Sequence, residues 1–377
     1  MPTQAAASDA KPMVLLLDDR SILGGGQQQL MLLAGGLRDR DWPYRIVCKR
    51  RSPLAGAATE RGLEVLHLPL RSEFDLWSAA RLHRLAHQLR AGIIHAHAPH
   101  AHGLMWLARM AGMRGVHIAH RHAGFPIKPN PLSAGKYRWG CDCVIAVSRG
   151  VQRNVLAIGV PESRTRVIPA VIDDSRFATA DAIDLRGEFS LPAGTRLVGT
   201  VGSLERHKGH HTLIDAWPGV LQELPDAALV IVGGGPLHET LREQARALGV
   251  AHRVFLPGHR SDVAGVLAAL DLFVLPSLIE GMPGALLEAM LTGLPCVATD
   301  CPGTEELIDH GRTGLIVPRE DVAQLGMAIV KLLTAGEVRD QIAARGPGIV
   351  RGGFLPRHMF DATLALYADL LATSSRA

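Results

Sequence analysis

The sequence predicts an α/β protein of two domains, each built on a doubly wound parallel sheet. Its 377 residues exceed one ordinary α/β domain and fit two of about 150 to 200 residues each. From Met13 onward, short β-branched or Leu-rich runs alternate with amphipathic stretches, which is the pattern of βαβ units. An irregular, Asp-rich segment, 167–192, separates two such series and suits a hinge. We expect domains at 1–172 and 173–357.

Each series contains six expected strands. In the first domain they lie near 13–18, 44–48, 64–68, 92–96, 117–121 and 142–147. In the second domain they lie near 196–202, 227–233, 253–256, 271–276, 294–298 and 314–317. Loops that follow the strands of a doubly wound sheet gather at its carboxyl edge, so a ligand is expected there, in a crevice shared by two facing domains.

The two ends of the chain are read separately. Residues 1–12 have neither an apolar core nor a basic start, so we expect a loose tail without a signal peptide. Apolar residues at helical spacing between Met359 and Leu371 predict a terminal helix within 358–377.

Composition narrows the class of protein. An apolar share of 47% with 20% charged residues is typical of a globular protein, and no apolar run is long enough to span a membrane. Five cysteines at scattered spacings favour a reducing cytoplasm over a disulfide framework. A net charge of +4 is too small to indicate nucleic-acid binding, although it would tolerate an anionic membrane surface.

The segment 271–300 carries the clearest candidate site. A buried strand ends at Pro276, and a helix is expected with Pro283 at its first position and Gly293 just past its end. Backbone N–H groups at such a helix start attract a diphosphate. The carboxylates of Glu280 and Glu288 could bind sugar hydroxyls there, or they could simply be exposed at helix ends.

Two further loops offer groups for an anion. Lys208 follows the second domain's first strand, where a cation would offset charge on a departing phosphate, unless it is only a solvated lysine. The turn containing Gly25 and Gly26 follows the first strand and allows close backbone approach. Because Lys49 and Arg50 stand where an acidic ribose ligand would follow the second strand, a dinucleotide oxidoreductase is disfavoured.

Histidines gather after the fourth and fifth strands of the first domain. They are His95, His97, His100, His102, His120 and His122. Such a group could bind a metal, but Pro99 interrupts the run, no acidic or cysteine partner is near, and strand alternation alone aligns His95 with His97. We therefore expect no metal, and packed histidines stay an alternative.

Motifs spread over about fifty residues resemble the retaining glycosyltransferases of family 4, which have the GT-B fold of two facing Rossmann-like domains. They are Glu280 and Glu288 with seven residues between them, Gly293-Leu294-Pro295, Ala298-Thr299-Asp300, Gly303-Thr304-Glu305-Glu306 and Gly311-Arg312-Thr313-Gly314. Val201-Gly202-Ser203 through Lys208-Gly209 extends the match. The resemblance implies a C-terminal helix that crosses back to the first domain.

The resemblance also implies roles for particular residues. Glu280 would contact the transferred sugar, Glu288 the nucleotide ribose and Lys208 a phosphate, while His122 would contact the donor sugar, with His120 as the alternative by register. Where the family often has arginine this chain has Ser203, so Arg206 is the candidate replacement or a solvated side chain. The remaining expected donor-binding residues are Gly25, Gly26, Gly281, Met282, Gly284, Ala285, Gly258 and Arg260.

The implied function is retaining transfer of a hexose-type sugar from a UDP- or GDP-sugar to a hydroxyl of a lipopolysaccharide, exopolysaccharide or glycolipid intermediate. No cofactor is expected, and Asp18-Asp19 and Asp173-Asp174 do not form the Asp-x-Asp site that a metal would need. The enzyme would work in the cytoplasm. The basic helix containing Arg81, Arg84 and Arg90 could lie on anionic lipid at the inner membrane, or it could be an ordinary helix with a core-facing apolar stripe and a solvated basic face. A UDP-sugar 2-epimerase and a non-catalytic binding homologue are the alternatives.

Overall fold

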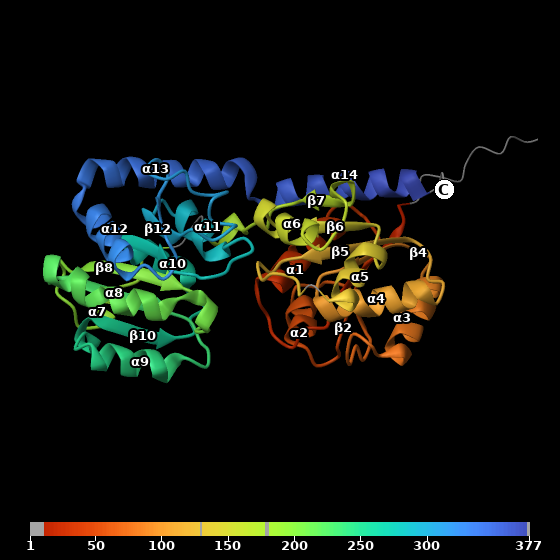
Figure 1. Ribbon diagram of the computed structural model, residues 1–377, viewed down its shortest axis with the longest axis horizontal. Coiled ribbons are helices and arrows are strands. Elements are labelled where there is room, and N and C mark those ends of the chain that lie inside the picture. Colours follow the sequence, from red (N-terminus) through yellow and green to blue (C-terminus); the bar gives the residue numbers. More distant parts are fainter. Residues whose placement is uncertain (1–10, 129, 178–180, 375–377) are drawn as a thin grey trace, which may run out of the picture. The chain divides into compact units, whose positions relative to one another are not determined.

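The computed structural model describes residues 11–128, 130–177 and 181–374 of the chain. The contacts divide the chain into two compact units (Figure 1). The first comprises residues up to Ala170 together with Pro356 onward, and the second runs from Val171 to Leu355. The change of unit therefore lies two residues before the expected boundary at 172. Most of the expected N-terminal tail lies outside the described residues.

The first unit is a seven-stranded parallel sheet in the order β3-β2-β1-β4-β5-β6-β7. Its strands are β1 (Met13–Leu17), β2 (Tyr44–Cys48), β3 (Val65–His67), β4 (Ala91–Ala96), β5 (Val116–Arg121), β6 (Cys143–Ala146) and β7 (Thr165–Val167). The seventh strand was not predicted, because the exposed Arg166 stands at its centre and leaves no apolar run.

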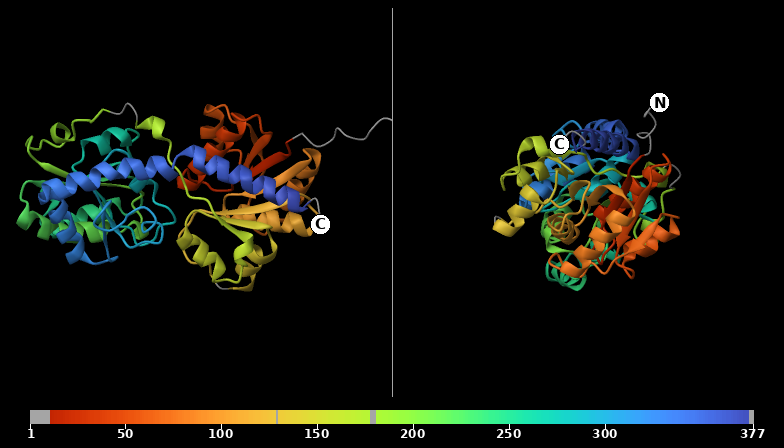
Figure 2. Two further views of the ribbon diagram at one scale, coloured as in Figure 1. Left: turned by 90° about the horizontal axis from the view of Figure 1, so that it is seen from above. Right: turned by 90° about the vertical axis from the view of Figure 1, so that its right-hand side faces the viewer.

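Helices connect these strands and cover the sheet. They are α1 (Gly25–Arg38), α2 (Pro53–Glu60), α3 (Leu76–Gln88), α4 (Pro99–Met110), α5 (Pro131–Trp139), α6 (Arg149–Leu156), the 3₁₀ helix η1 (Glu162–Arg164) and α14 (Pro356–Ser374). Helix α14 lies along α1, where Gly36 leaves room for the ring of Phe360 (Figure 2). A Cβ at Gly36 would stand 2.5 Å from that ring, so the absent side chain sets how closely the helices approach.

The second unit is a six-stranded parallel sheet in the order β10-β9-β8-β11-β12-β13. Its strands are β8 (Arg196–Val201), β9 (Ala227–Val232), β10 (Val254–Gly258), β11 (Leu272–Leu275), β12 (Cys296–Thr299) and β13 (Leu315–Val317). Its helices are η2 (Asp174–Arg176), α7 (Leu185–Glu188), η3 (Arg206–Lys208), α8 (His210–Glu223), α9 (His238–Ala247), η4 (Ala251–Arg253), α10 (Val263–Ala269), α11 (Gly284–Leu291), α12 (Val322–Thr334) and α13 (Gly336–Gly353).

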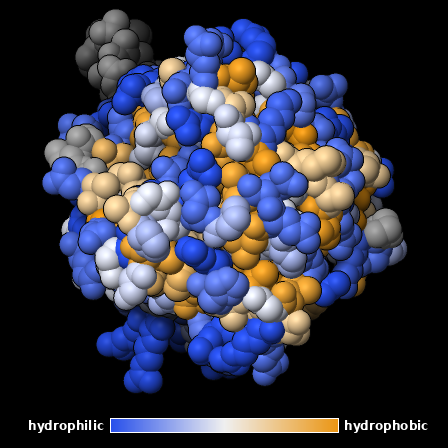
Figure 3. All heavy atoms as spheres, turned by 90° about the vertical axis from the view of Figure 1, so that its left-hand side faces the viewer, coloured by the Kyte–Doolittle hydropathy of each residue, from blue (hydrophilic) through white to orange (hydrophobic). Residues whose placement is uncertain are grey.

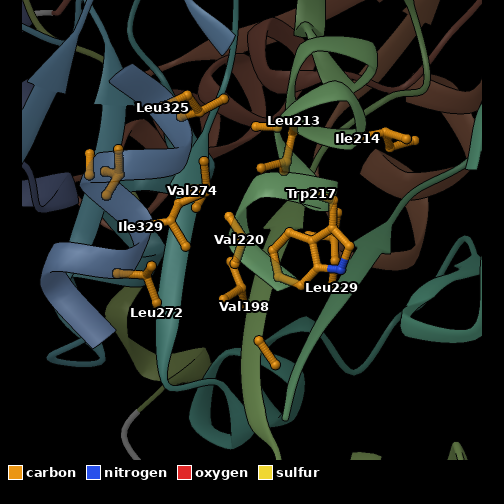
Figure 4. Close-up of a cluster of buried hydrophobic side chains, with 14 of the residues drawn as sticks. Val198, Leu213, Ile214, Trp217, Val220, Leu229, Leu272, Val274, Leu325 and Ile329 are labelled. Carbon is orange, nitrogen blue, oxygen red and sulfur yellow. The ribbon is translucent and has the colours of Figure 1, made fainter. Parts of the chain in front are cut away.

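The core of the second unit packs α8 and α12 against the sheet. Trp217 of α8 is fully buried among Val198, Leu229 and neighbouring aliphatic side chains (Figure 4). Burying a side chain of this size stabilises the fold by about 1.5–3 kcal/mol relative to exposure. The surface seen in Figure 3 shows hydrophilic and hydrophobic side chains interspersed. Within the described part of the chain, no helix has both the length and the apolar character needed to cross a bilayer.

Both sheets contain a topological switch point, where the direction of strand addition reverses. In the first unit it lies between β1 and β4, and in the second between β8 and β11. Loops that leave the carboxyl ends of two such neighbouring strands diverge and leave room for a ligand. The start of α1 at Gly25–Gly26 follows β1, and His97 follows β4. Lys208 and Glu280 lie in the segments that follow β8 and β11.

Candidate functional site

Lys208 and Glu280 meet at the switch point of the second unit. The Lys208 ammonium donates a hydrogen bond of 2.8 Å to Glu280 Oε1, although 72 residues separate them. Ser277 Oγ donates to the same oxygen at 2.7 Å. The Glu280 side chain is only 8% exposed and that of Lys208 is 24% exposed. The site therefore presents a carboxylate and an ammonium held in fixed positions at the edge of the sheet.

Backbone contacts between the two loops hold this ion pair in place. The N–H of Leu278 donates to the carbonyl of His207 at 2.8 Å. Gly209 adopts a left-handed φ of +67°, and a Cβ there would collide with the carbonyl of Pro276. Only glycine therefore lets the Lys208 loop pack directly on the loop after β11.

Helix α11 begins at Gly284, four residues after Glu280. Its N-cap is Pro283, whose side chain cannot cap those N–H groups. The expectation that Pro283 is the first helical residue was wrong by one position, since Gly284 is the first. Gly293, with φ +75°, ends the helix as expected. The uncapped N–H groups and the helix dipole favour an anion at this point.

The loop before α11 is tightly packed. Met282 is buried, while Gly284 is exposed and Ala285 is half-buried. A Cβ at Gly303 would collide with the carbonyl of Gly281, so the following loop presses against this turn. The packing of the Gly303 loop thus fixes the path of the backbone at Gly281.

Glu288 lies one helical turn into α11 and is half-buried. Burial raises the pKa of its carboxyl above the usual range, and the positive charge of Arg176 opposes that rise. Among the described residues, no hydrogen bond or ion pair to its carboxylate is found. With no hydrogen-bond partner among the described residues, this carboxylate can accept two hydrogen bonds from a diol.

Four other expected donor-binding residues occupy different surroundings. Ser203 is half-buried and its carbonyl lies 3.3 Å from His210 Nε2, while Arg206 is exposed. Arg260 forms ion pairs with Glu188 and Asp262, at 2.7 Å each. Gly258 ends β10 with φ +81° and accepts a hydrogen bond from Gly233. Within the described residues, neither Arg260 nor Arg206 forms a hydrogen bond or ion pair with Lys208 or Glu280.

In the first unit, the structure brings His122 and the glycine turn together. Gly26 lies in the first turn of α1, and a Cβ there would stand 3.3 Å from the His122 ring. Burial, helped by the charge of Arg20, lowers the pKa of His122 to about 4, so the ring is neutral near pH 7. Gly25 has no atom within 4 Å of its own Cβ position. A neutral imidazole beside an open helix start can donate or accept one hydrogen bond.

Sequence reasoning missed three polar residues of these loops. Ser277 bonds to Glu280, and Gln27 donates to the buried Asp18 carboxylate at 2.8 Å. Asp18 directly follows β1 and Ser277 comes two residues after β11, and a position at the end of a buried strand is the signal that could have identified each.

The two units match two different family models. Residues 23–176 match the model of "Glycosyltransferase Family 4" and residues 195–335 that of "Glycosyl transferases group 1". A GDP-mannose-dependent α-(1-6)-phosphatidylinositol monomannoside mannosyltransferase of Mycobacterium tuberculosis is 33% identical over 278 residues, which cover 70% of this chain and 71% of that protein. A lipopolysaccharide core biosynthesis glycosyltransferase of Rhizobium meliloti is 28% identical over 77% of this chain and 79% of its own length.

Solved structures match the fold over nearly the whole chain. Anabaena Alr3699/HepE, in complex with UDP-glucose, has a TM-score of 0.82 at 24% identity and covers 96% of this chain and 100% of its own. The two Rossmann-like domains are therefore those of the GT-B fold. Fold, family models and relatives agree: this chain belongs to glycosyltransferase family 4 and is a glycosyltransferase.

Proposed function

We propose that this enzyme transfers a hexose from a nucleoside diphosphate sugar to a hydroxyl of a glycolipid or lipopolysaccharide intermediate, with retention of configuration. The observation that carries the proposal is the Lys208–Glu280 ion pair at the switch point, next to the uncapped start of α11. A cation and a row of N–H groups suit a diphosphate, and a buried carboxylate suits sugar hydroxyls.

The second unit would bind the donor. Lys208 and the backbone N–H groups of Gly281, Met282, Gly284 and Ala285 would hold the diphosphate. Glu288 would accept hydrogen bonds from the ribose diol. The loops at Ser203, Arg206, Gly258 and Arg260 would border the nucleotide. The diphosphate would compete with Glu280 for the Lys208 ammonium, which would free the carboxylate to bind the transferred sugar.

In the transfer step, the bond from the anomeric carbon to the phosphate oxygen breaks, and the acceptor oxygen bonds to the same face of that carbon. The acceptor proton goes to the departing phosphate oxygen, so no protein nucleophile is needed. Negative charge grows on the diphosphate, where Lys208 and the α11 N–H groups stabilise it, and we propose that no metal is required for this. The donor contacts expected of Gly25, Gly26 and His122 in the first unit stay predictions from the family resemblance.

The acceptor class is supported by the relatives, which act on phosphatidylinositol monomannoside and lipopolysaccharide core. The first unit also exposes large apolar side chains on α3, α4 and α5: Leu76, Trp77, Met110, Leu132 and Trp139. The Arg81 guanidinium lies 3.4 Å from the centre of the Trp77 ring, a pairing suited to a lipid headgroup region. We propose that this surface rests on the cytoplasmic face of a membrane.

Donor binding is tested by thermal shift of the purified chain with UDP, GDP, ADP and their common sugars, with and without EDTA. A ligand at a hundredfold excess over its Kd stabilises the folded state by about 2.7 kcal/mol. We expect a selective rise that EDTA does not change, that Glu288→Gln abolishes and that Glu223→Gln, a change at an exposed carboxylate of α8, preserves. No rise with any nucleotide, or a rise equally present in Glu288→Gln, would contradict the proposal.

A further assay addresses the stereochemistry of transfer. The anomeric coupling constant in the NMR spectrum of the product should match that of the donor sugar, and an inverted configuration would refute retention.

The proposed membrane contact is tested by sedimentation with anionic vesicles. Leu76→Glu should weaken sedimentation, whereas Met327→Glu, at an exposed apolar position of the second unit, should not. Equal sedimentation of both variants would place the membrane contact elsewhere.

A further inference from the structure

Three histidines from two neighbouring strands converge inside the first unit. His95 lies in β4, His97 directly follows it, and His120 lies in β5. His95 pairs in register with Ile118, and side chains alternate along a strand, so all three project from the same face of the sheet. Their ring centres are 4.2 to 5.3 Å apart. The local sequence does not show that His120 of β5 becomes a neighbour of His95 and His97.

The cluster is enclosed by protein. His95, His97 and His120 are 0%, 4% and 8% exposed. Within the described residues, no hydrogen-bond partner reaches Nε2 of His95, Nε2 of His97 or either nitrogen of His120. Each buried polar atom left without a partner costs about 1–3 kcal/mol, so several together in one place call for a ligand.

Neighbouring contacts direct free nitrogens toward one another. Tyr367 of α14 lies 2.7 Å from His95 Nδ1, and His122 Nε2 lies 3.3 Å from His97 Nδ1. A histidine whose Nδ1–H is engaged in this way presents its Nε2 lone pair to a metal, and such outer contacts commonly orient metal ligands. Burial lowers the pKa of all three rings well below the usual range, which keeps them in the neutral form that binds metals.

We propose that His95, His97 and His120 bind one divalent transition-metal ion. One nitrogen from each ring lies within 4.8 Å of the others. Around a tetrahedral zinc ion with Zn–N bonds near 2.0–2.1 Å, ligand nitrogens are about 3.3 Å apart, so modest ring rotations would close the site. Three imidazoles without a carboxylate favour Zn²⁺, Ni²⁺ or Cu²⁺ over Mg²⁺, Ca²⁺ or Mn²⁺. A water molecule or His122 could fill the fourth position.

Lys208, Glu280 and Glu288, the proposed donor contacts of the second unit, take no part in this site. The ion would link β4 to β5, and through His95 and Tyr367 it would tie α14 to the sheet. Because His97 contacts His122, the bound ion would also fix the orientation of the His122 ring. The expected role is therefore to support the strand ends, while transfer itself proceeds without the metal contacting the diphosphate.

The test uses the untagged full-length chain, stripped with chelator, incubated with Zn²⁺ and passed through a desalting column. Mass spectrometry of the eluted metal should give about one equivalent for the wild type and less than a tenth for His120→Asn. His102→Asn is the matched control, because His102 is equally buried and unpartnered among the described residues but lies outside the cluster. It should retain the full equivalent.

Loading the wild type with Co²⁺ gives a readout that does not depend on a variant folding. Visible d–d bands of four-coordinate intensity should appear and should be displaced by Zn²⁺. Their absence, a zinc content that His120→Asn leaves unchanged, or an equal loss in His102→Asn would overturn the proposal. Nucleotide thermal shifts measured on the stripped protein report on the second unit, so failure of this site and failure of donor binding are distinguishable.

Discussion

Replacing Glu280 by glutamine keeps the size of the side chain and removes its charge. In the wild type, Oε1 accepts hydrogen bonds from Lys208 Nζ at 2.8 Å and from Ser277 Oγ at 2.7 Å. The glutamine oxygen can accept both bonds, so the loops should keep their positions. What is lost is the negative charge opposite the ammonium, which we propose also faces the transferred sugar.

The structure separates the expected cost to stability from the cost to turnover. A hydrogen bond to a charged group contributes about 1.5–3 kcal/mol and a neutral one about 0.5–1.5 kcal/mol, and solvent at the partly exposed Lys208 offsets some of the difference. We expect a loss of about 1–2 kcal/mol in the free energy of unfolding, or a Tm lower by a few degrees. Loss of a charge that acts in the transition state should lower kcat by about 10²–10³.

Turnover is measured as release of nucleoside diphosphate from the donor identified by thermal shift, at saturating donor, alongside the unfolding curve of each variant. Glu205→Gln is the matched control, since Glu205 is an exposed carboxylate on the Lys208 loop, and it should stay within about twofold of wild type. A folded Glu280→Gln enzyme with wild-type turnover would refute the role of the carboxylate. If the loss of activity is fully explained by the fraction of unfolded enzyme, the carboxylate has no effect on turnover beyond its effect on stability, and the prediction is refuted.

Three further predictions concern the packing and titration of the units. Gly303→Ala should displace the turn at Gly281 and weaken nucleotide binding at least tenfold, as measured by titration; unchanged affinity would show that the turn does not position the ligand. Gly36→Ala should overpack against Phe360 and lower the free energy of unfolding by about 1–3 kcal/mol in denaturant titrations, and Phe360→Leu should relieve that loss; a neutral effect would contradict the tight contact. Burial lowers the pKa of His210 to about 4, so the unfolded state binds its proton first and stability should fall by up to about 1.4 kcal/mol per pH unit between pH 6.5 and 4; an unaltered slope in His210→Gln would refute this.

The sheets were predictable because their strands are buried, β-branched runs with helical patterns between them. All twelve expected strands are present, whereas the short and partly exposed Thr165–Val167 carried too little pattern to be recognised. The glycosyltransferase family was also predictable, since its motifs are local in the sequence.

What the sequence could not show are pairings between distant residues. Lys208 and Glu280 were each selected, but nothing in their neighbourhoods indicated that they share an ion pair. Arg260 was expected at the donor, and its two carboxylate partners include Glu188, 72 residues away. The contact of His97 with His120 likewise depends on the register between two strands.

Helix α14 gives the first unit a discontinuous chain, with all of the second unit inserted before its last helix. During synthesis, the segment that ends at Ala170 emerges first but lacks the helix that packs on α1, so the face around Gly36 and His95 stays uncovered until the last residues appear. The second unit, which is contiguous, can complete its core earlier. The nascent protein would thus finish its later half before its earlier one, and a chain truncated before Pro356 would expose that face permanently.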